Sequence, residues 1–214
     1  MTAYYPAFLK LEGKKCVVIG GGEVAERKVM SLLDCGAAVT VVSPQMCQAL
    51  GELVESGRVL ALTREYRPGD LQGAFVVIAA TDDAAVNDLI GKEAQQERAL
   101  INVVDNPERC DFIVPSVVRR GDLLIGISTG GKSPALAKKI RQELENLFPE
   151  DFAQLTTLLS EVRREVKGLS VSPEAWQKAI SPELVRLVRR GEVEAAKKRL
   201  LAKLSTGRGS EEGD

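Results

Sequence analysis

The stretch VVIGGGEVAERK, residues 17–28, contains the residues whose types and spacing best fit a chemical role. Gly20, Gly22 and Ala25 match the pattern G-x-G-x-x-A where an apolar run ends and a helical pattern begins. In this pattern the first glycine allows a tight turn, the second lets a pyrophosphate approach the backbone, and the small third residue lets helix and strand pack closely. The N–H groups at the helix start then attract the anion. The motif predicts a dinucleotide site; the simpler alternative is a turn that needs glycine only for its backbone conformation.

Polar residues also follow later apolar runs. One run ends in AATDD, which contains Thr81 and Asp82, and another ends in INVVDNP, which contains Asp105. The carboxyl ends of parallel strands meet at the edge where open α/β sheets bind ligands, so we expect these residues at one crevice. For Asp82 and Asp83, helix capping is a stronger interpretation than catalysis. For Asp105, a turn ahead of Asn106 and a catalytic role fit the residues equally well.

The usual partner of the adenine ribose is missing from the sequence. An acidic residue is expected about 20 positions after the glycine motif. The second apolar run instead ends in VVSP, with Ser43 and Pro44. The Ser43 hydroxyl could donate to a ribose or phosphate oxygen, and the residues alone leave the choice between NAD and NADP open.

A second glycine pair lies in the segment ISTGGKSPALAKK, directly before a helix that Ser133 would cap, with Pro134 in its first position. Glycine N–H groups before a helix offer another anion site. With basic residues close by, this arrangement fits a polyanionic substrate, while a solvated basic helix face is the alternative. The candidate substrate-binding residues are Ser128, Gly130, Gly131, Lys132, Arg119 and Arg120.

Strand-length apolar runs alternate with helical patterns in the first half of the chain. Strands are expected at 16–19, 39–42, 59–62, 75–80 and 100–104, and helices at 24–35, after Pro44, and at 84–97. This alternation predicts an α/β fold with a Rossmann-type parallel sheet and crossover helices.

The pattern changes after Pro107. The segment FIVPSVVRRGDLLIGIST predicts two strands joined by a hairpin turn, and the next helix ends at Pro149. Helices are then expected at 152–166, 175–180, 182–190 and 193–204, followed by a disordered tail, STGRGSEEGD. We therefore predict three parts: a nucleotide-binding domain over 1–111, a small α+β domain over 112–149, and a helical C-terminal region over 150–214.

Composition limits the other possibilities. The 214 residues are 44% hydrophobic and 28% charged with a formal net charge of −1, which gives no general attraction to nucleic acid or membrane. No apolar run reaches the length of about 20 residues that a membrane span needs, and the start lacks a signal peptide's basic-then-apolar order, so we expect a cytoplasmic protein. The four cysteines form no CxxC pair, so we expect free thiols. Histidine is absent, so we expect no metal site and assign proton transfer to carboxylates, lysines, cysteines, tyrosines or water.

Five motifs, in this order and spacing, resemble the precorrin-2 dehydrogenase and sirohydrochlorin ferrochelatase family: VVIGGGEVAERK, AATDD, NVVDNP, FIVPSVV and STGGKSPALAKKIR. This family forms the N-terminal module of siroheme synthases. The resemblance implies oxidation of precorrin-2, a tetrapyrrole, to sirohydrochlorin with NAD as cofactor, and in some members insertion of Fe²⁺ to make siroheme. It also implies an intertwined homodimer, with 112–149 as the dimerisation and substrate domain. Because fused synthases continue into a methyltransferase, we expect this chain to be a stand-alone module.

The resemblance also assigns roles to residues. In family members the aspartate that matches Asp105 is implicated in both activities, so Asp105 is our candidate base for the proton that leaves with the hydride. The cofactor-binding set implied by the resemblance and the glycine motif is Gly20, Gly22, Glu23, Val24, Ala25, Ser43, Pro44, Thr81, Asn102 and Val103.

Two other functions stay open. Single-activity and dual-activity members carry the same motifs, so ferrochelatase activity is an alternative, with the metal held by carboxylates, macrocycle nitrogens and water. A non-enzymatic NAD-sensing module is the second alternative, although the chain is not basic, as a module that reports to DNA would be.

Overall fold

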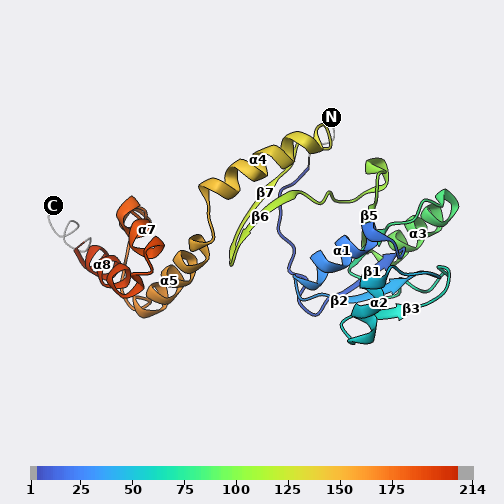
Figure 1. Ribbon diagram of the computed structural model, residues 1–214, viewed down its shortest axis with the longest axis horizontal. Coiled ribbons are helices and arrows are strands. Elements are labelled where there is room, and N and C mark those ends of the chain that lie inside the picture. Colours follow the sequence, from blue (N-terminus) through green and yellow to red (C-terminus); the bar gives the residue numbers. More distant parts are fainter. Residues whose placement is uncertain (1–3, 207–214) are drawn as a thin grey trace. The chain divides into compact units, whose positions relative to one another are not determined.

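Figure 1 shows the chain as a computed structural model, which describes residues 4–206. The chain divides into two compact units, residues 1–114 and 115–214. The boundary predicted after residue 111 lies close to this division, and the further boundary predicted after residue 149 stays a prediction.

The first unit is built on one parallel sheet with the strand order β3-β2-β1-β4-β5. Its strands are β1 (Lys15–Ile19), β2 (Ala38–Val42), β3 (Leu60–Leu62), β4 (Val76–Ala79) and β5 (Leu100–Val103). Along the chain, β2 and β3 extend the sheet on one side of β1, and β4 and β5 then extend it on the other side. A crevice opens at the carboxyl ends of the strands at such a switch point. The predicted α/β fold with a Rossmann-type parallel sheet is confirmed.

Alternate residues of β1 pack on opposite faces of this sheet, as the pleat of a strand requires. Cys16 and Val18 lie in one core, beneath α1 (Glu23–Leu33) and α2 (Gln48–Glu55). Val17 and Ile19 lie in the other core, which includes residues of α3 (Ala84–Glu97). Burial on both faces explains why the strands are continuous apolar runs. The predicted helices and strands are present, with ends shifted by a residue or two.

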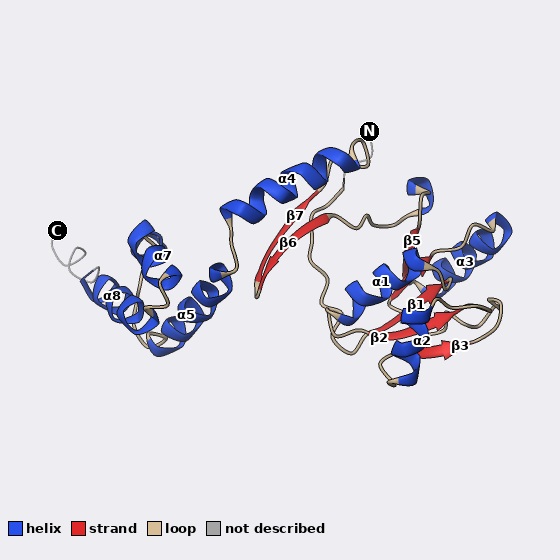
Figure 2. Cartoon of the chain, in the orientation of Figure 1, coloured by secondary structure: helices blue, strands red, loops and turns tan. Residues whose placement is uncertain are grey.

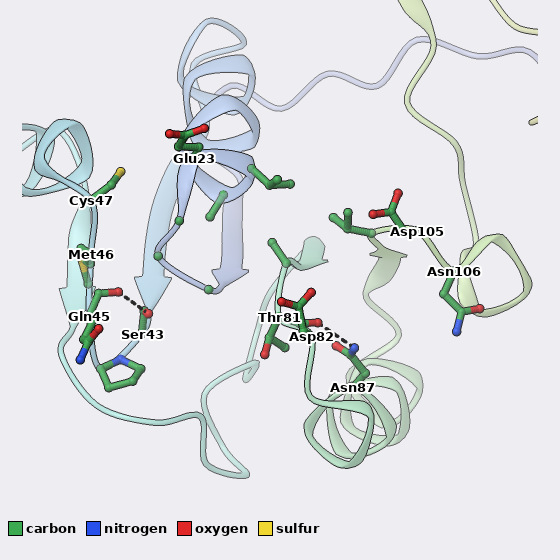
Figure 3. Close-up of a pocket in the computed structure, with 18 of the residues that line it drawn as sticks. Glu23, Ser43, Gln45, Met46, Cys47, Thr81, Asp82, Asn87, Asp105 and Asn106 are labelled. Atoms are coloured by element: carbon green, nitrogen blue, oxygen red, sulfur yellow. Dashed lines mark hydrogen bonds between the residues drawn. The ribbon is translucent and has the colours of Figure 1, made fainter. Parts of the chain in front are cut away.

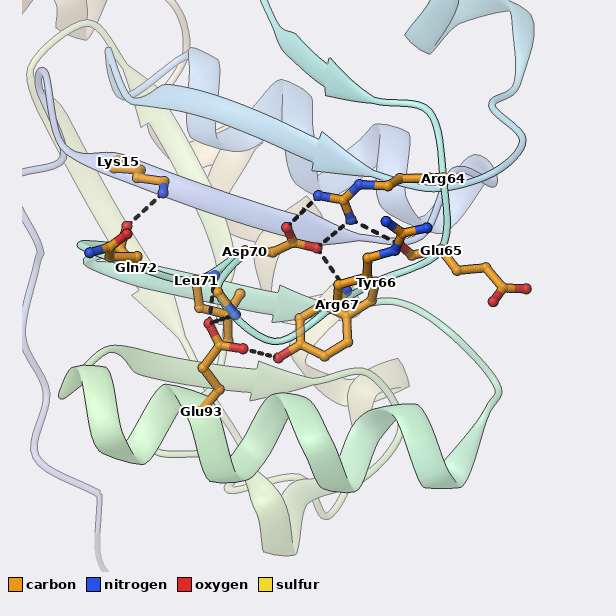
Figure 4. A network of polar contacts seen from close by, with 10 residues as sticks. Lys15, Arg64, Glu65, Tyr66, Arg67, Asp70, Leu71, Gln72 and Glu93 are labelled. Carbon is orange, nitrogen blue, oxygen red and sulfur yellow. Dashed lines mark hydrogen bonds and ion pairs between the residues drawn. The ribbon is translucent and has the colours of Figure 1, made fainter.

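A buried carboxylate ties the loop before β4 to α3 (Figure 4). Glu93 accepts hydrogen bonds from the N–H groups of Gly69, at 3.0 Å, and Leu71, at 2.9 Å, and from the hydroxyl of Tyr66. Burial, and then the bond to Glu93, raise the pKa of Tyr66. A buried charge needs partners of this kind, so the role of Glu93 is to fix the path of the loop.

The second unit begins with an antiparallel hairpin of β6 (Ser116–Arg120) and β7 (Leu123–Ile127), as predicted (Figure 2). Five helices follow within the described residues: α4 (Pro134–Leu147), α5 (Asp151–Glu165), α6 (Pro173–Ala179), α7 (Pro182–Arg189) and α8 (Val193–Thr206). A Ser-Pro pair starts three of them, since Ser133, Ser172 and Ser181 each accept a hydrogen bond from a first-turn N–H. The last four helices share a core of apolar side chains.

Arg120 joins the hairpin to the end of α4. Its guanidinium donates to the carbonyl oxygens of Phe148, at 2.8 Å, and Glu145, at 3.3 Å, and lies 3.1 Å from the carboxylate of Glu150. These carbonyls belong to the end of the helix and would otherwise lack partners. Arg120 therefore has a structural role in the second unit that the sequence analysis did not predict.

Helix α8 ends two residues later than predicted, because it continues through Ser205 and Thr206, the first two residues of the predicted tail. The rest of the predicted disordered tail lies outside the described residues. Among the residues that the structure describes, no helix is both long enough and apolar enough to span a membrane.

Candidate nucleotide-binding site

A cavity of about 1080 Å³ lies at the carboxyl edge of the parallel sheet (Figure 3). The turn after β1 and the ends of β2, β4 and β5 all contribute to its wall. Among its lining residues are Gly20, Gly22, Glu23, Val24, Ala25, Ser43, Pro44, Thr81, Asp82 and Asp105. The structure therefore brings together most of the predicted cofactor-binding residues and the predicted base.

The first glycine of the motif makes the tight turn. Gly20 has φ +121, in the region that side chains rarely adopt, and a Cβ there would overlap the carbonyl oxygen of Ala80. Gly21, which the sequence analysis did not single out, is equally constrained, because its Cβ would overlap the carbonyl oxygen of Gln45. Its own carbonyl accepts a hydrogen bond from Cys47 N–H at 2.8 Å. This pair of glycines lets the turn pack closely against two neighbouring segments.

The last glycine of the turn faces open space. Gly22 has an ordinary extended backbone, with φ −85, and a Cβ there would meet no atom within 4 Å. It is the N-cap of α1, and no side chain caps the first N–H groups of this helix. Free N–H groups and the positive end of the helix dipole attract an anion. The pocket is therefore suited to a pyrophosphate, as the motif predicted.

The end of β2 forms another wall of the pocket. Ser43 is buried, and its hydroxyl donates to the carbonyl oxygen of Gln45 at 2.6 Å. Gln45, Met46 and Cys47 also line the pocket, although the sequence analysis did not select them. These three residues follow β2 and belong to no recognisable motif. Their place in the pocket wall is therefore known only from the path of the loop in the structure.

Helix capping was predicted for both aspartates after β4, and the structure shows it for Asp83 alone. Asp83 accepts hydrogen bonds from the N–H groups of Ala85, at 2.8 Å, and Val86, at 3.0 Å, and so caps α3. Thr81 and Asp82 line the pocket, and the carbonyl oxygen of Thr81 accepts a bond from Asn87 at 3.0 Å.

Asp105 lies directly after β5 on the exposed rim of the pocket (Figure 3). Its φ of +59 is in the left-handed region, which Asp adopts more readily than most residues but still uncommonly. A strained residue at a pocket is a sign of function when its surroundings hold it in place. Lys28 of α1 is a cationic neighbour of Asp105. Burial and the charge of Arg27 lower the pKa of Lys28, and the charge of Asp105 opposes this lowering.

The sulfur of Cys110 holds the loop that carries Asp105. It accepts a hydrogen bond from Val103 N–H and donates to the carbonyl oxygen of Asn106, both at 3.2 Å. The Asn102 side chain donates to the carbonyl oxygen of Phe112 at 2.9 Å. Asn102 and Val103 are buried, and neither is among the residues that line the pocket. Together these contacts close the loop behind Asp105.

Replacing Cys110 with alanine is expected to lower the turnover number without changing nucleotide affinity. The substitution removes two hydrogen bonds worth about 0.5–1.5 kcal/mol each, which corresponds to a loss in kcat of at most roughly 10²-fold. Cys110→Ser, which keeps a donor and an acceptor, should retain more activity. Steady-state kcat and the Kd for the nucleotide would be measured for both variants. Equal kcat for Cys110→Ala and the unchanged protein would exclude this positioning role.

The predicted substrate-binding residues belong to the second unit. Gly130 and Gly131 have φ +61 and +80, as a tight loop requires. This loop bonds partly to itself, since Gly130 N–H donates to the Ser128 hydroxyl at 3.0 Å and Ser133 N–H to the Thr129 hydroxyl at 2.9 Å. Lys132 is exposed. The loop thus presents a cation at the start of α4.

The switch point, the glycine turn and the uncapped helix define a Rossmann-type nucleotide-binding protein. Comparison with known proteins extends this result. Residues 7–116, just over half of the chain, match the NAD(P)-binding family model, and residues 120–147 match the model described as sirohaem biosynthesis protein central. The chain belongs to the precorrin-2 dehydrogenase and siroheme synthase family that its motifs resemble, and its cofactor is a nicotinamide dinucleotide.

Individual relatives agree with this assignment. The siroheme synthase of Methylobacillus flagellatus is 41% identical over 208 residues, which are 95% of this chain and 44% of that protein. The siroheme synthase of Methylococcus capsulatus is 38% identical over 202 residues, 92% of this chain and 43% of that protein. The solved structure of SirC, precorrin-2 dehydrogenase, has 29% identity and a TM-score of 0.74, and the match covers 91% of this chain and all of SirC. The chain spans less than half the length of the curated relatives it matches.

Proposed function

We propose that this protein oxidises precorrin-2 to sirohydrochlorin with NAD, as a step of siroheme biosynthesis. The observation that carries the proposal is one pocket that contains both an anion-binding glycine turn and, across it, a carboxylate on a firmly held loop, Asp105. The printed names of the relatives, siroheme synthase and precorrin-2 dehydrogenase, support the same activity.

The residues of the pocket suit this chemistry. Oxidation of a carbon removes a hydride and a proton, and NAD, when bound, supplies the hydride acceptor. The N–H groups of Glu23 and Val24 at the start of α1 bind the pyrophosphate and fix its position. Asp105 is exposed at the pocket rim and accepts the proton. Asp105 lies in a turn two residues after β5, and the contacts of Cys110 hold this turn, which keeps the carboxylate at a constant position relative to the glycine turn.

The pocket also supports NAD over NADP. Residues 43–47 contain no lysine or arginine, and Arg109 is the one cation among the described residues that line the pocket. Arg109 follows β5 and pairs with Asp88, whereas the adenine ribose is expected at the end of β2. A 2′-phosphate would therefore meet no cation at the end of β2.

Gln45→Arg is expected to improve use of NADP about tenfold in kcat/KM, since a hydrogen bond to a charged group contributes about 1.5–3 kcal/mol, part of which offsets the ordering of the side chain. Gln45 is exposed, so the new side chain meets no packing constraint. Initial rates with NAD and NADP would be compared. Lys198→Arg, in the second unit, is the control for a new arginine elsewhere. An unchanged NADP rate would remove the end of β2 from the ribose site.

The second unit supplies residues that suit an acidic substrate. The exposed Lys132 and the N–H groups of Gly130 and Gly131 suit the carboxylate arms of a tetrapyrrole, with Ser128 in the same loop. Arg119 pairs with Leu124 near the turn of the hairpin, so it would contact a more distant part of the substrate. The guanidinium of Arg120 already has partners at the end of α4, so we assign it to holding the hairpin that carries the site.

A homodimer accounts for apolar side chains that a monomer would expose to water. Tyr5 is 90% exposed, Phe8 68%, Leu136 50% and Leu147 63%. Leu136 and Leu147 are eleven positions apart in α4, so they lie on one face of that helix, and an exposed apolar helix face marks an association surface. We expect light scattering coupled to gel filtration to give twice the chain mass. Phe8→Glu and Leu147→Glu should each shift the protein toward the monomer. A monomeric unchanged protein would contradict the proposal.

The direct test is anaerobic. Precorrin-2 generated by a separate methyltransferase would be mixed with the protein and NAD, and the absorbance change to sirohydrochlorin followed. NAD-dependent oxidation is the expected result, and its absence would overturn the proposal. Adding Fe²⁺ afterwards tests the ferrochelatase alternative, in which iron is a substrate. A cytoplasmic location stays a prediction from the sequence.

A further inference from the structure

The helical part of the second unit contains a groove to which the proposed reaction assigns no role. It has a volume of about 750 Å³ and lies where α5, α6 and the segment between them meet. This volume is within the range of about 300–1,000 Å³ that small-molecule sites occupy. Its lining residues are Thr156, Leu159, Ser160, Arg163, Val166, Lys167, Leu169, Val171, Pro173, Trp176 and Ile180.

The floor of the groove is apolar and partly open to water. Leu159 and Trp176 are half-buried against the helical core, while Leu169 and Ile180 are 43% and 42% exposed. Trp176 is the only tryptophan in the chain. A tryptophan left partly exposed among apolar neighbours offers a broad, flat surface on which a ring can stack.

The rim of the groove is cationic. Arg163 and Lys167 are exposed, lie four positions apart along the chain, and form no ion pair within the described part of the protein. Basic residues of the neighbouring helices are paired with acids of α5, as Lys197 of α8 is with Glu165 and Arg189 of α7 is with Asp151. None of the described lining residues is acidic. The groove therefore combines an apolar floor with two unpaired positive charges on one side.

We propose that this groove binds one face of a planar macrocycle that carries carboxylates, with the ring against Trp176 and carboxylates at Arg163 and Lys167. The ligand class, a tetrapyrrole, rests on the proposed function. Arginine and lysine at the edge of an aromatic surface complement a flat ring with acidic groups around its periphery. An acidic amphipathic helix is a weaker fit, because it needs apolar anchors spread over several turns, whereas this floor is confined to the junction of two helices.

The groove is tested by equilibrium binding of uroporphyrin I, a planar octacarboxylate that is stable in air, to the full chain. The Soret band of the porphyrin reports binding. The double substitution Arg163→Glu/Lys167→Glu is expected to weaken binding about tenfold or more, because two favourable charge contacts become repulsive. Trp176→Phe, which keeps an aromatic face, should bind more tightly than Trp176→Ala. Lys198→Glu, an exposed charge of α8 outside the groove, is the matched control and should bind as the unchanged protein does.

The outcomes separate this inference from the proposed function. Equal binding by the unchanged protein and the double variant, or no binding at all, would overturn the groove assignment. An acidic helical peptide that displaces the porphyrin and binds more tightly would also overturn it. Groove-dependent binding without any NAD-dependent oxidation of precorrin-2 would support the groove while overturning the proposed function. Oxidation whose KM for precorrin-2 is unaffected by the double substitution, together with groove-independent porphyrin binding, would leave the function and remove the groove.

Discussion

Asp105→Ala is expected to lower kcat for precorrin-2 oxidation by about 10²–10⁴-fold, the usual contribution of a general base. The carboxylate is exposed at the rim of the pocket, whereas the pyrophosphate is expected at the glycine turn. The loss should therefore appear in kcat and not in the Kd for the nucleotide. Anaerobic initial rates at saturating NAD, and a fluorescence titration with NADH, measure the two quantities separately.

Asp105→Asn distinguishes the carboxylate from the turn. Asparagine also adopts the left-handed conformation seen at φ +59, so this variant keeps the loop and removes only the base. Asp82→Asn is the matched control, since Asp82 is a second exposed carboxylate in the same pocket. Full activity of Asp105→Asn, or an equal loss in Asp82→Asn, would show that Asp105 is not the proton acceptor.

The strands were predictable because a strand that is buried on both faces of a sheet is a continuous apolar run in the sequence. Runs such as VVIA of β4 are continuous and apolar, and the Ser-Pro pairs and the glycine turn mark where helices begin. The end of α8 was missed for a corresponding reason. Ser205 and Thr206 have no periodic apolar pattern of their own, yet they continue a helix whose buried face lies at Leu200 and Leu204.

The site was predictable only where a motif or a strand end marks it. Gly20, Gly22 and Asp105 each have a position in sequence that implies their role. Gly21 and Cys110 do not, because their importance comes from how the loops around them fold back, which no motif in the sequence marks. Gly21 packs against the carbonyl of Gln45, and Cys110 bonds back to Val103. The error at Arg120 is the opposite one. Its charge, near the second glycine pair in the sequence, led to the prediction that it binds substrate, but its guanidinium has partners within the fold.

Gly22→Ala is expected to weaken NAD binding by about ten- to a hundredfold, which corresponds to about 1.4–2.7 kcal/mol. The added methyl group would occupy the space through which the pyrophosphate approaches the backbone. The folded protein itself should tolerate it, since the backbone at Gly22 has φ −85 and nothing lies within 4 Å of the new Cβ. Isothermal titration with NAD and the thermal midpoint of unfolding measure the two effects.

Two alanine controls separate binding from folding. Gly20→Ala should lower the thermal midpoint as well as NAD affinity, because its Cβ would overlap Ala80 and its φ is +121. Gly51→Ala, in α2 and outside the pocket, should leave NAD affinity unchanged and raise stability by about 1 kcal/mol, since alanine favours a helix over glycine. If Gly22→Ala bound NAD as tightly as Gly51→Ala, the glycine turn would be a purely conformational feature, and the pyrophosphate would have to bind elsewhere in the pocket.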